Sequence, residues 1–382
     1  MDWQPHAAEL AAVATPRSSR WRQPMMSVPR HMFVPRWWDI PPGARYGTWQ
    51  LHDGAADPQE WLRAAYGDQT LVTRVGRLHA DHAAPADRPV GRPTSSATLP
   101  GLVVRMLRHG DVYDGADVLD VATGSGYSAA LLAHRLGEKR VTSIDVDPYL
   151  TAAATERLAG IGLRPKVLTV DATGPLPGTY DRIVSMVSVR PVPASWLTAL
   201  RMGGRLVTVV AGTSLILTAN KTDDGGAEGR IEWDRAMFMP SRTGEDYPPG
   251  ARESFDAVWD IQGEEITRGS YPVMDVSYNW DLPAMLAVVA GPGIEHHYTE
   301  DDDGHRTARM VHADGSWARA TAHGDEAPIV HQGGPRRLWD VLDEIRAHWL
   351  RHGELPVRGS YARITPDGTI HLRRGAWQAI IT

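Results

Sequence analysis

Short apolar runs alternate with amphipathic stretches between about residues 94 and 210 of the chain. Buried strands are predicted by five of these runs, at 118–121, 141–146, 167–170, 180–186 and 205–210. Helices are predicted between them by apolar residues at helical spacing, over 102–107, 128–136, 149–158 and 193–200. Strands that alternate with helices in this way predict a doubly wound, mostly parallel α/β sheet.

The pattern differs on both sides of this α/β stretch. Residues 7–13 have helical spacing, whereas residues 28–35 contain two prolines and predict turns or extended backbone. After residue 210, alternating apolar and polar positions predict antiparallel strands at 214–219 and 227–239, joined by a turn at 223–226.

A separate α+β module is predicted in the C-terminal third. Tyr247-Pro248-Pro249-Gly250 has the composition of a linker. Beyond it, hairpins are predicted around Asp314-Gly315 and Pro366-Asp367-Gly368, and a helix over 338–351. We therefore expect an N-terminal segment packed on the active site, a central α/β domain and a C-terminal α+β module, at residues 1–93, 94–242 and 252–382.

Composition and charge exclude several classes of protein. The 382 residues include no cysteine, which excludes disulfide scaffolds, thiolate metal sites and cysteine nucleophiles. A formal charge of −6 argues against a nucleic-acid partner, which requires a basic surface. No apolar run approaches the ~18 residues of a membrane span, and residues 1–6 lack the form of a signal peptide. The histidines lack metal-site spacing. We expect a cytoplasmic protein without metal, membrane or nucleic-acid partners.

A glycine-rich loop, Ala122-Thr123-Gly124-Ser125-Gly126, follows the first predicted strand. Ligands of open parallel sheets bind beyond the carboxyl ends of the strands. Gly124 and Gly126 permit positive φ and close approach of the backbone to a ligand, and the following helix begins with free N–H groups. Nucleotide, flavin and sulfonium cofactors all use such a loop, so the loop alone leaves the cofactor open.

The acids at the strand ends narrow this choice. Asp145 ends the second strand about twenty residues after the loop, where a carboxylate accepts both hydroxyls of a ribose. Asp171 ends the third strand, in a position to meet an adenine amino group. The chain has no P-loop, and Ala122 breaks the usual dinucleotide fingerprint. Together with Asp120, these acids favour S-adenosylmethionine, although a helix cap or turn is the alternative role for each. The candidate cofactor residues are Asp120, Ala122, Thr123, Gly124, Ser125, Gly126, Asp145, Val146, Asp171 and Ala172.

Separated motifs occur in the order found in protein-L-isoaspartate O-methyltransferases. They lie at 28–35 (Val-Pro-Arg-His-Met-Phe-Val-Pro), 66–69 (Tyr-Gly-Asp-Gln), 94–96 (Thr-Ser-Ser), 118–127, 184–196, 203–207 and 238–240. The chain resembles this family over about residues 1–242. The resemblance implies a Rossmann-like class I methyltransferase sheet and S-adenosylmethionine as cofactor. It also implies that Ser96, with its neighbours Thr94 and Ser95, orients the substrate carboxylate. Capping of the next helix is the alternative role for this cluster, and Thr98 is also available for it.

The sequence departs from the repair enzymes at several positions. Ala122 stands where they usually carry glycine, residues 96–100 and 170–172 differ from their motifs, and a long segment follows Pro240. These features resemble extended relatives encoded beside lanthipeptide and graspetide precursor genes. That resemblance implies methylation of an Asp side chain in a modified precursor peptide, followed by aspartimide and isoaspartate. The C-terminal module is then expected to hold the peptide.

Elementary chemistry supports a carboxylate acceptor. An Asp side chain, with a reference pKa of about 3.9, is ionised at neutral pH, so the enzyme needs to supply alignment and exclusion of water rather than a strong base. Two alternatives are a general repair methyltransferase for L-isoaspartyl residues and a non-catalytic protein that binds a precursor peptide. The intact loop and strand-end acids argue against the second, and the missing G-x-S-x-G elbow argues against a hydrolase.

Overall fold

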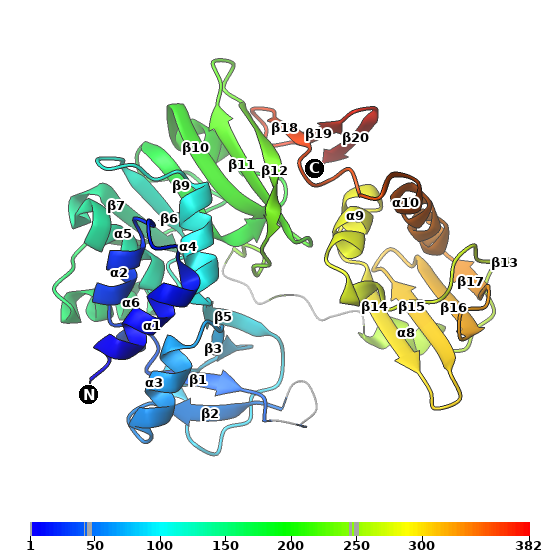
Figure 1. The fold of residues 1–382 in the computed structure, drawn as a ribbon, viewed down its shortest axis with the longest axis horizontal. Coiled ribbons are helices and arrows are strands. Elements are labelled where there is room, and N and C mark those ends of the chain that lie inside the picture. The colour runs from blue at the N-terminus through cyan, green and yellow to red at the C-terminus, as the bar shows by residue number, and fades with distance from the viewer. Residues whose placement is uncertain (1, 42, 44–47, 244–246, 248–251) are drawn as a thin grey trace.

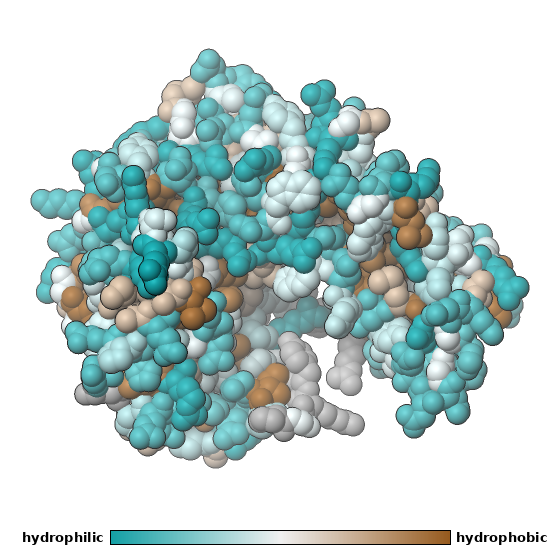
Figure 2. Space-filling view, viewed as in Figure 1, coloured by the Kyte–Doolittle hydropathy of each residue, from teal (hydrophilic) through white to brown (hydrophobic). Residues whose placement is uncertain are grey.

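Three β-sheets organise the part of the chain that the computed structural model describes, residues 2–41, 43, 48–243, 247 and 252–382 (Figure 1). A ten-stranded sheet forms the centre. One five-stranded sheet precedes it in the sequence, and the strands of the other, at residues 265–333, come between its strands that end at Arg235 and begin at Tyr361. Hydrophilic side chains cover most of the face seen in Figure 2, with apolar ones scattered among them. Among the described residues, none of the helices combines the length and apolar character that a membrane crossing requires.

The N-terminal part contains a small sheet with helices packed beside it. Its helices are α1 (Gln4–Ala14), α2 (Arg22–Ser27), η1 (Arg30–Phe33), α3 (Pro58–Tyr66) and η2 (Ala80–His82). Its strands are β1 (Arg36–Asp39), β2 (Gln50–Asp53), β3 (Leu71–Val75), β4 (Leu78–His79) and β5 (Pro93–Ala97). Because β5 pairs with β3, the expected boundary between residues 93 and 94 falls inside a strand of this sheet.

The central sheet has the predicted class I methyltransferase topology. Its first seven strands are β6 (Val118–Val121), β7 (Val141–Asp145), β8 (Lys166–Thr169), β9 (Tyr180–Val189), β10 (Leu200–Val210), β11 (Leu215–Lys221) and β12 (Ala227–Arg235). The first five are parallel and the next two antiparallel. The accompanying helices are α4 (Pro100–His109), α5 (Tyr127–Leu136), η3 (Glu138–Arg140), α6 (Pro148–Gly160) and α7 (Ala194–Ala199). The strand expected at 205–210 begins earlier, at Leu200, and its register against β9 shifts between Leu200 and Arg205.

The C-terminal part divides between two sheets. Its first elements are α8 (Arg252–Val258), β13 (Glu265–Arg268), η4 (Val276–Tyr278), α9 (Asp281–Val289), β14 (Glu295–Glu300), β15 (His305–Val311), β16 (Trp317–His323) and β17 (Ile329–Gly333). The strands form an antiparallel sheet in the order β13-β17-β16-β15-β14. The hairpins and the long helix predicted from the sequence are present. Apart from Tyr247, the expected linker at 247–250 lies outside the described residues.

The last three strands return to the central sheet. After α10 (Leu338–His352) the chain forms β18 (Tyr361–Ile364), β19 (Ile370–Arg374) and β20 (Trp377–Ile381). Strand β18 pairs with β12, from Ala227 opposite Ile364 to Arg230 opposite Tyr361. The pairing covers backbone groups of β12 that would otherwise form an open edge. The expected module at 252–382 is therefore continuous with the central sheet at its end, and one buried cluster contains apolar side chains of β11, α9 and α10.

Candidate active site

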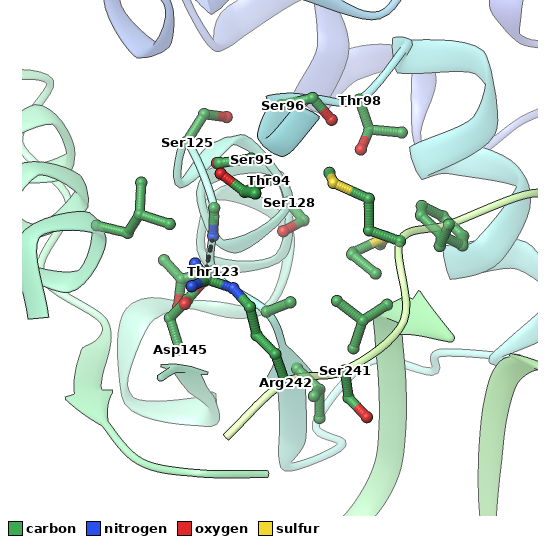
Figure 3. A pocket seen from close by; sticks show the side chains of 18 of the residues that line it. Thr94, Ser95, Ser96, Thr98, Thr123, Ser125, Ser128, Asp145, Ser241 and Arg242 are labelled. Carbon is green, nitrogen blue, oxygen red and sulfur yellow. Dashed lines mark hydrogen bonds between the residues drawn. The ribbon is translucent and has the colours of Figure 1, made fainter. Parts of the chain in front are cut away.

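A cavity of about 520 Å³ opens at the carboxyl ends of the parallel strands. Strand β6 lies between β7 and β9, so the direction of strand succession reverses here, which is where ligands bind in such sheets. The cavity walls come from β5, from the β6–α5 loop, from the end of β7 and from residues 237–242 (Figure 3). Of the thirteen residues singled out in the sequence, ten line it: Thr94, Ser95, Ser96, Ala122, Thr123, Gly124, Ser125, Asp145, Val146 and Ala172.

Backbone geometry and hydrogen bonds fix the glycine-rich loop. Gly124 has φ +51° and Gly126 has φ +94°, as the sequence pattern predicts for a tight loop. The N–H groups of Ala122 and Thr123 both donate to the carbonyl of Ile144, at 2.8 and 2.9 Å. Gly126 lies outside the cavity wall, and its lack of a side chain allows close packing instead, since a Cβ there would lie 3.1 Å from Ala154.

Asp145 holds the loop and faces the cavity at one end (Figure 3). Its Oδ2 accepts a hydrogen bond from the Gly124 N–H at 2.9 Å, and its Oδ1 accepts one from the Asp147 N–H at 3.0 Å. Burial raises the pKa of this carboxyl group. Apolar side chains adjoin it in the wall, from Ile144, Val146, Leu150, Val170 and Ala172. A carboxylate beside an apolar wall suits a ligand with a ribose and a flat base.

Asp120 and Asp171 do not line the cavity. Asp120 is completely buried, and its Oδ2 accepts hydrogen bonds from the hydroxyls of Ser128 (2.9 Å) and Ser143 (2.7 Å). Burial raises the pKa of Asp120 to about 7. Because Ser128 lines the cavity, Asp120 contributes to the site indirectly, by holding the Ser128 hydroxyl in place. Asp171 accepts hydrogen bonds from the N–H and the hydroxyl of Thr173, at 2.8 and 2.7 Å, so it has the turn role that was its alternative.

The hydroxyl groups of β5 have different environments. Thr94 donates to the Gly76 carbonyl at 2.8 Å, and Ser95 accepts from the Thr73 hydroxyl at 2.9 Å, so both groups hold the strand in place. Ser96 lines the cavity, and within the described part of the chain its hydroxyl has no hydrogen-bond partner. It is therefore the hydroxyl of the three that is available to a ligand.

The capping role considered for Ser96 and Thr98 belongs to other residues. Asp68 accepts a hydrogen bond from the Gly101 N–H at 2.7 Å, and Thr70 accepts one from the Leu99 N–H at 3.2 Å, both at the start of α4. Ser96 and Thr98 lie together at the end of the cavity opposite Asp145 (Figure 3). Their side chains are thus free to meet a substrate rather than committed to the helix.

Arg30, a residue of the 28–35 motif, supports this end of the site from behind. Its side chain is 1% exposed, and the guanidinium donates to four backbone carbonyls, of Ala65, Gln69, Ala97 and Thr98. Burial lowers its pKa to about 10. The sequence motif contains Arg30 but does not indicate this role, because the four carbonyls are 35 to 68 positions away.

Arg242 and Asp147 are further functional candidates, which the sequence pattern did not single out. Asp147 follows the predicted strand and precedes Pro148, a pattern typical of a helix cap, and it does cap α6 through the Tyr149 N–H. Its Oδ2 also lies 3.3–3.6 Å from nitrogens of His79, Arg74 and Arg242. Burial opposes ionisation of Asp147, but the hydrogen bonds and nearby positive charges outweigh it and hold its pKa at about 2.

The segment that carries Arg242 crosses the cavity. Ser188 of β9 donates its N–H to the Met239 carbonyl at 2.9 Å and accepts the Ser241 N–H at 2.8 Å. These bonds place Arg242 beside Asp145 (Figure 3). The segment thereby joins the central sheet, the end of the cavity at Asp145 and, through Asp147, the N-terminal sheet.

Comparisons with known proteins agree with this geometry. A family profile described as Protein-L-isoaspartate(D-aspartate) O-methyltransferase (PCMT) matches residues 80–245. The chain is 30% identical over 208 residues to the protein-L-isoaspartate O-methyltransferase of Ignicoccus hospitalis, covering 53% of this chain and 79% of that protein. It is also 30% identical over 217 residues to protein-L-isoaspartate O-methyltransferase 1 of Archaeoglobus fulgidus, covering 56% and 81%.

A solved protein-L-isoaspartate O-methyltransferase structure shares the fold, with a TM-score of 0.50 and 14% identity. The match covers 97% of this chain and 98% of that one, so it extends through the C-terminal part. The segment after Pro240 therefore does not set this chain apart from that fold, contrary to the expectation from the sequence. The chain belongs to the protein-L-isoaspartate O-methyltransferase family, whose members are S-adenosylmethionine-dependent protein carboxyl O-methyltransferases.

Proposed function

We propose that this enzyme methylates an Asp side-chain carboxylate in a ribosomally made, modified peptide of the lanthipeptide or graspetide type. The observation that carries the proposal is the end of the cavity at Ser96 and Thr98, where two hydroxyls face the cavity without serving the helix that follows. Ser96, Thr98 and Leu99 line this end, and the sequence resemblance implies that their segment departs from the corresponding motif of the repair enzymes.

S-adenosylmethionine supplies an electrophilic methyl group when bound. Asp145 would accept hydrogen bonds from the ribose hydroxyls, since each of its oxygens keeps a lone pair beyond the backbone bond that it accepts. Val146, Leu150 and Ala172 would flank the base. Gly124, with its left-handed backbone and open Cα, allows the loop to lie close to the ligand.

Ser96 would donate a hydrogen bond to one oxygen of the acceptor carboxylate and leave the other oxygen to attack. Alignment of this kind is worth roughly 7–11 kcal/mol in well-oriented reactions. Once the ester has formed, the next backbone nitrogen of the peptide attacks its carbonyl carbon. A C–N bond forms, the bond to the methoxy group breaks, and methanol leaves with the proton of the nitrogen. The product is an aspartimide, which water opens to isoaspartate.

Repair of L-isoaspartyl residues in proteins is the second candidate. It uses the same carboxylate chemistry, and the match of a solved protein-L-isoaspartate O-methyltransferase along nearly the whole chain favours it. The two candidates differ in the peptide that reaches Ser96, so only the substrate distinguishes them. A non-catalytic peptide-binding role is the third, and the intact cavity argues against it.

Labelled S-adenosylmethionine tests these candidates with two substrates, an isoaspartyl hexapeptide and a fully modified peptide of the lanthipeptide or graspetide type. Mass spectrometry follows the gain of a methyl group and the loss of water. We expect conversion of the modified peptide alone, strongly reduced in Ser96→Ala and Asp145→Ala. Thr198→Ala, which removes an exposed hydroxyl in α7, is the matched control. Methylation of the isoaspartyl peptide alone would assign repair, and cofactor binding without methylation of either peptide would assign the non-catalytic role.

A further inference from the structure

Four basic residues form a row across the C-terminal sheet, which we call the arginine row: His297, Arg309, Arg319 and His331. His297 of β14 is opposite Arg309 of β15, Arg309 is opposite Arg319 of β16, and Arg319 is opposite His331 of β17. Residues directly opposite one another point to the same face of a sheet. Like charges in such positions destabilise the sheet, so folding alone does not account for two adjacent arginines here.

Trp259 covers one end of the row. The guanidinium of Arg309 lies 3.7 Å from the centre of the indole ring, and the His297 ring lies 5.0 Å from it, edge to face. Arg319 donates to the Trp259 carbonyl at 2.7 Å. Arg309 is 7% exposed, and its Nε and Nη1 have no hydrogen-bond partner among the residues that the structure describes. Buried polar groups are normally hydrogen-bonded, so these two nitrogens have donor capacity that the described residues leave unused.

The positive charge of the row rests on its two arginines. Burial and the charge of Arg319 lower the pKa of Arg309, and Asp260 opposes that effect. Burial and the neighbouring arginines also lower the pKa values of His297 and His331, so these imidazoles are neutral at pH 7. The row thus presents two guanidinium groups between neutral rings.

The remainder of this face suits an extended peptide. Helix α8 packs on Val311 and Trp317, at one side of the row. The adjacent row at the other side consists of Thr299, Thr307, Thr321 and Ile329. Ile329 and Ile266 of the neighbouring strand β13 are 52% and 47% exposed. Hydroxyls and an apolar margin therefore flank the guanidinium groups.

An ion pair joins this face to the residue that precedes β5, the strand that carries Ser96. Arg92 Nη2 lies 2.9 Å from Glu295 Oε1. Arg92 is two residues before Thr94 on β5, and Glu295 is two residues before His297 on β14. Because a strand rises about 3.3 Å per residue, the row begins roughly 7 Å along β14 from this contact. Ser96 lies four residues from Arg92, roughly 13 Å along the strand, so a peptide with one side chain beside Ser96 would need to span that length before it followed β14.

We propose that the arginine row binds an acidic segment of the substrate peptide, whose Asp or Glu carboxylates accept hydrogen bonds from Arg309 and Arg319. The proposal rests on the proposed function, since the substrate is a peptide. Charge complementarity selects this occupant: guanidinium groups pair with carboxylates in charge-assisted hydrogen bonds, and the row is a local basic feature in a chain of net charge −6.

Fluorescence anisotropy with the full-length protein tests the proposal. The probe is a fluorescein-labelled peptide of alternating aspartate and glycine, and its partner has asparagine at every aspartate. We expect the aspartate peptide to bind at least about tenfold more tightly than the asparagine peptide, and more weakly as salt rises. Arg319→Gln should weaken binding of the aspartate peptide about tenfold. Arg373→Gln, which removes an exposed charge from β19, should leave it unchanged.

Three results would overturn the proposal: equal affinity for the two peptides, equal effects of Arg319→Gln and Arg373→Gln, or preferential binding of a single-stranded oligonucleotide that Arg319→Gln abolishes. Arg309→Gln is a second variant, and circular dichroism confirms that each variant is folded. The binding experiment needs neither cofactor nor methyl transfer, so its failure would leave the proposed reaction intact. Conversely, if the protein bound the aspartate peptide but methylated no peptide, the arginine row would still be a binding site and the proposed function would be wrong.

Discussion

Ala122 occupies a backbone conformation that favours glycine. Its φ of +70° costs an L-residue roughly 1–2 kcal/mol of backbone strain. Glycine would avoid this strain, but it gives the unfolded chain more conformational entropy, which lowers the free energy of unfolding by about 0.4–1 kcal/mol. We therefore expect Ala122→Gly to raise the free energy of unfolding by about 0.5–1 kcal/mol, measured by urea denaturation at constant m-value. Ala152→Gly, at an exposed position of α6, should lower it by about 1 kcal/mol. An unchanged or lower midpoint for Ala122→Gly would show that Ala122 is not strained.

Asp120 makes stability depend on pH. Burial raises its pKa from an ordinary 3.8 to about 7, so between these values the folded protein holds a proton that the unfolded chain has lost. The stability associated with this group is present below about pH 4 and is lost as pH rises through 7, by about 1 kcal/mol per pH unit. Asp120→Asn should lack this slope. Urea denaturation of both proteins between about pH 4 and pH 7 measures this difference. If the free energies of unfolding of the two proteins changed with pH in the same way, Asp120 would not be the group responsible.

At the scale of elements, Arg30 ties η1 to the strand that carries Ser96. A lysine at this position keeps the positive charge. Its three N–H donors are on one nitrogen, however, and cannot reach the carbonyls of three chain segments that the two guanidinium nitrogens of Arg30 contact. We expect Arg30→Lys to lower stability by about 2 kcal/mol and to reduce kcat, with little change in the cofactor Kd. Calorimetry with S-adenosylmethionine and steady-state kinetics separate these effects.

Arg63→Lys, at an exposed position of α3, controls for the exchange itself. If Arg30→Lys weakened cofactor and peptide binding equally while kcat stayed constant, Arg30 would stabilise the fold without positioning Ser96 and Thr98. If Arg30→Lys lowered kcat and left the cofactor Kd unchanged, the substitution would act on the positions of Ser96 and Thr98.

Local patterns predicted most elements of the central sheet and most of the residues that line the cavity near Asp145. Asp145 and Gly124 were identifiable because strand ends and glycine loops are contiguous in sequence. The same pattern could not separate Asp145 from Asp171, because a carboxylate after a strand serves a ligand or a turn equally well. The support from Arg30 was not predictable either, since its partners come together only through tertiary packing.

At the scale of the whole molecule, β18–β20 belong to the core of the methyltransferase sheet. The sequence pattern predicted their hairpin but not their partner, because a hairpin's turn chemistry carries no information about the distant edge that it covers. Ile364, Ile370, Leu372 and Ile381 are at most 1% exposed. At roughly 1.5–3 kcal/mol for each buried side chain, they contribute about 6–12 kcal/mol, comparable with the whole stability of a typical domain.

Deletion of residues 356–382 should therefore abolish cooperative unfolding and leave β12 as an open edge that promotes aggregation. Gel filtration and urea denaturation measure both effects. Two single changes within the same strands give a finer test: Ile370→Ala, at a fully buried position, should cost about 2–5 kcal/mol. Ile380→Ala, at a side chain that is 59% exposed, should cost less than about 0.5 kcal/mol. A soluble truncated chain that unfolds like the full protein would instead make these strands an independent addition, and the methyltransferase core would end near Arg242.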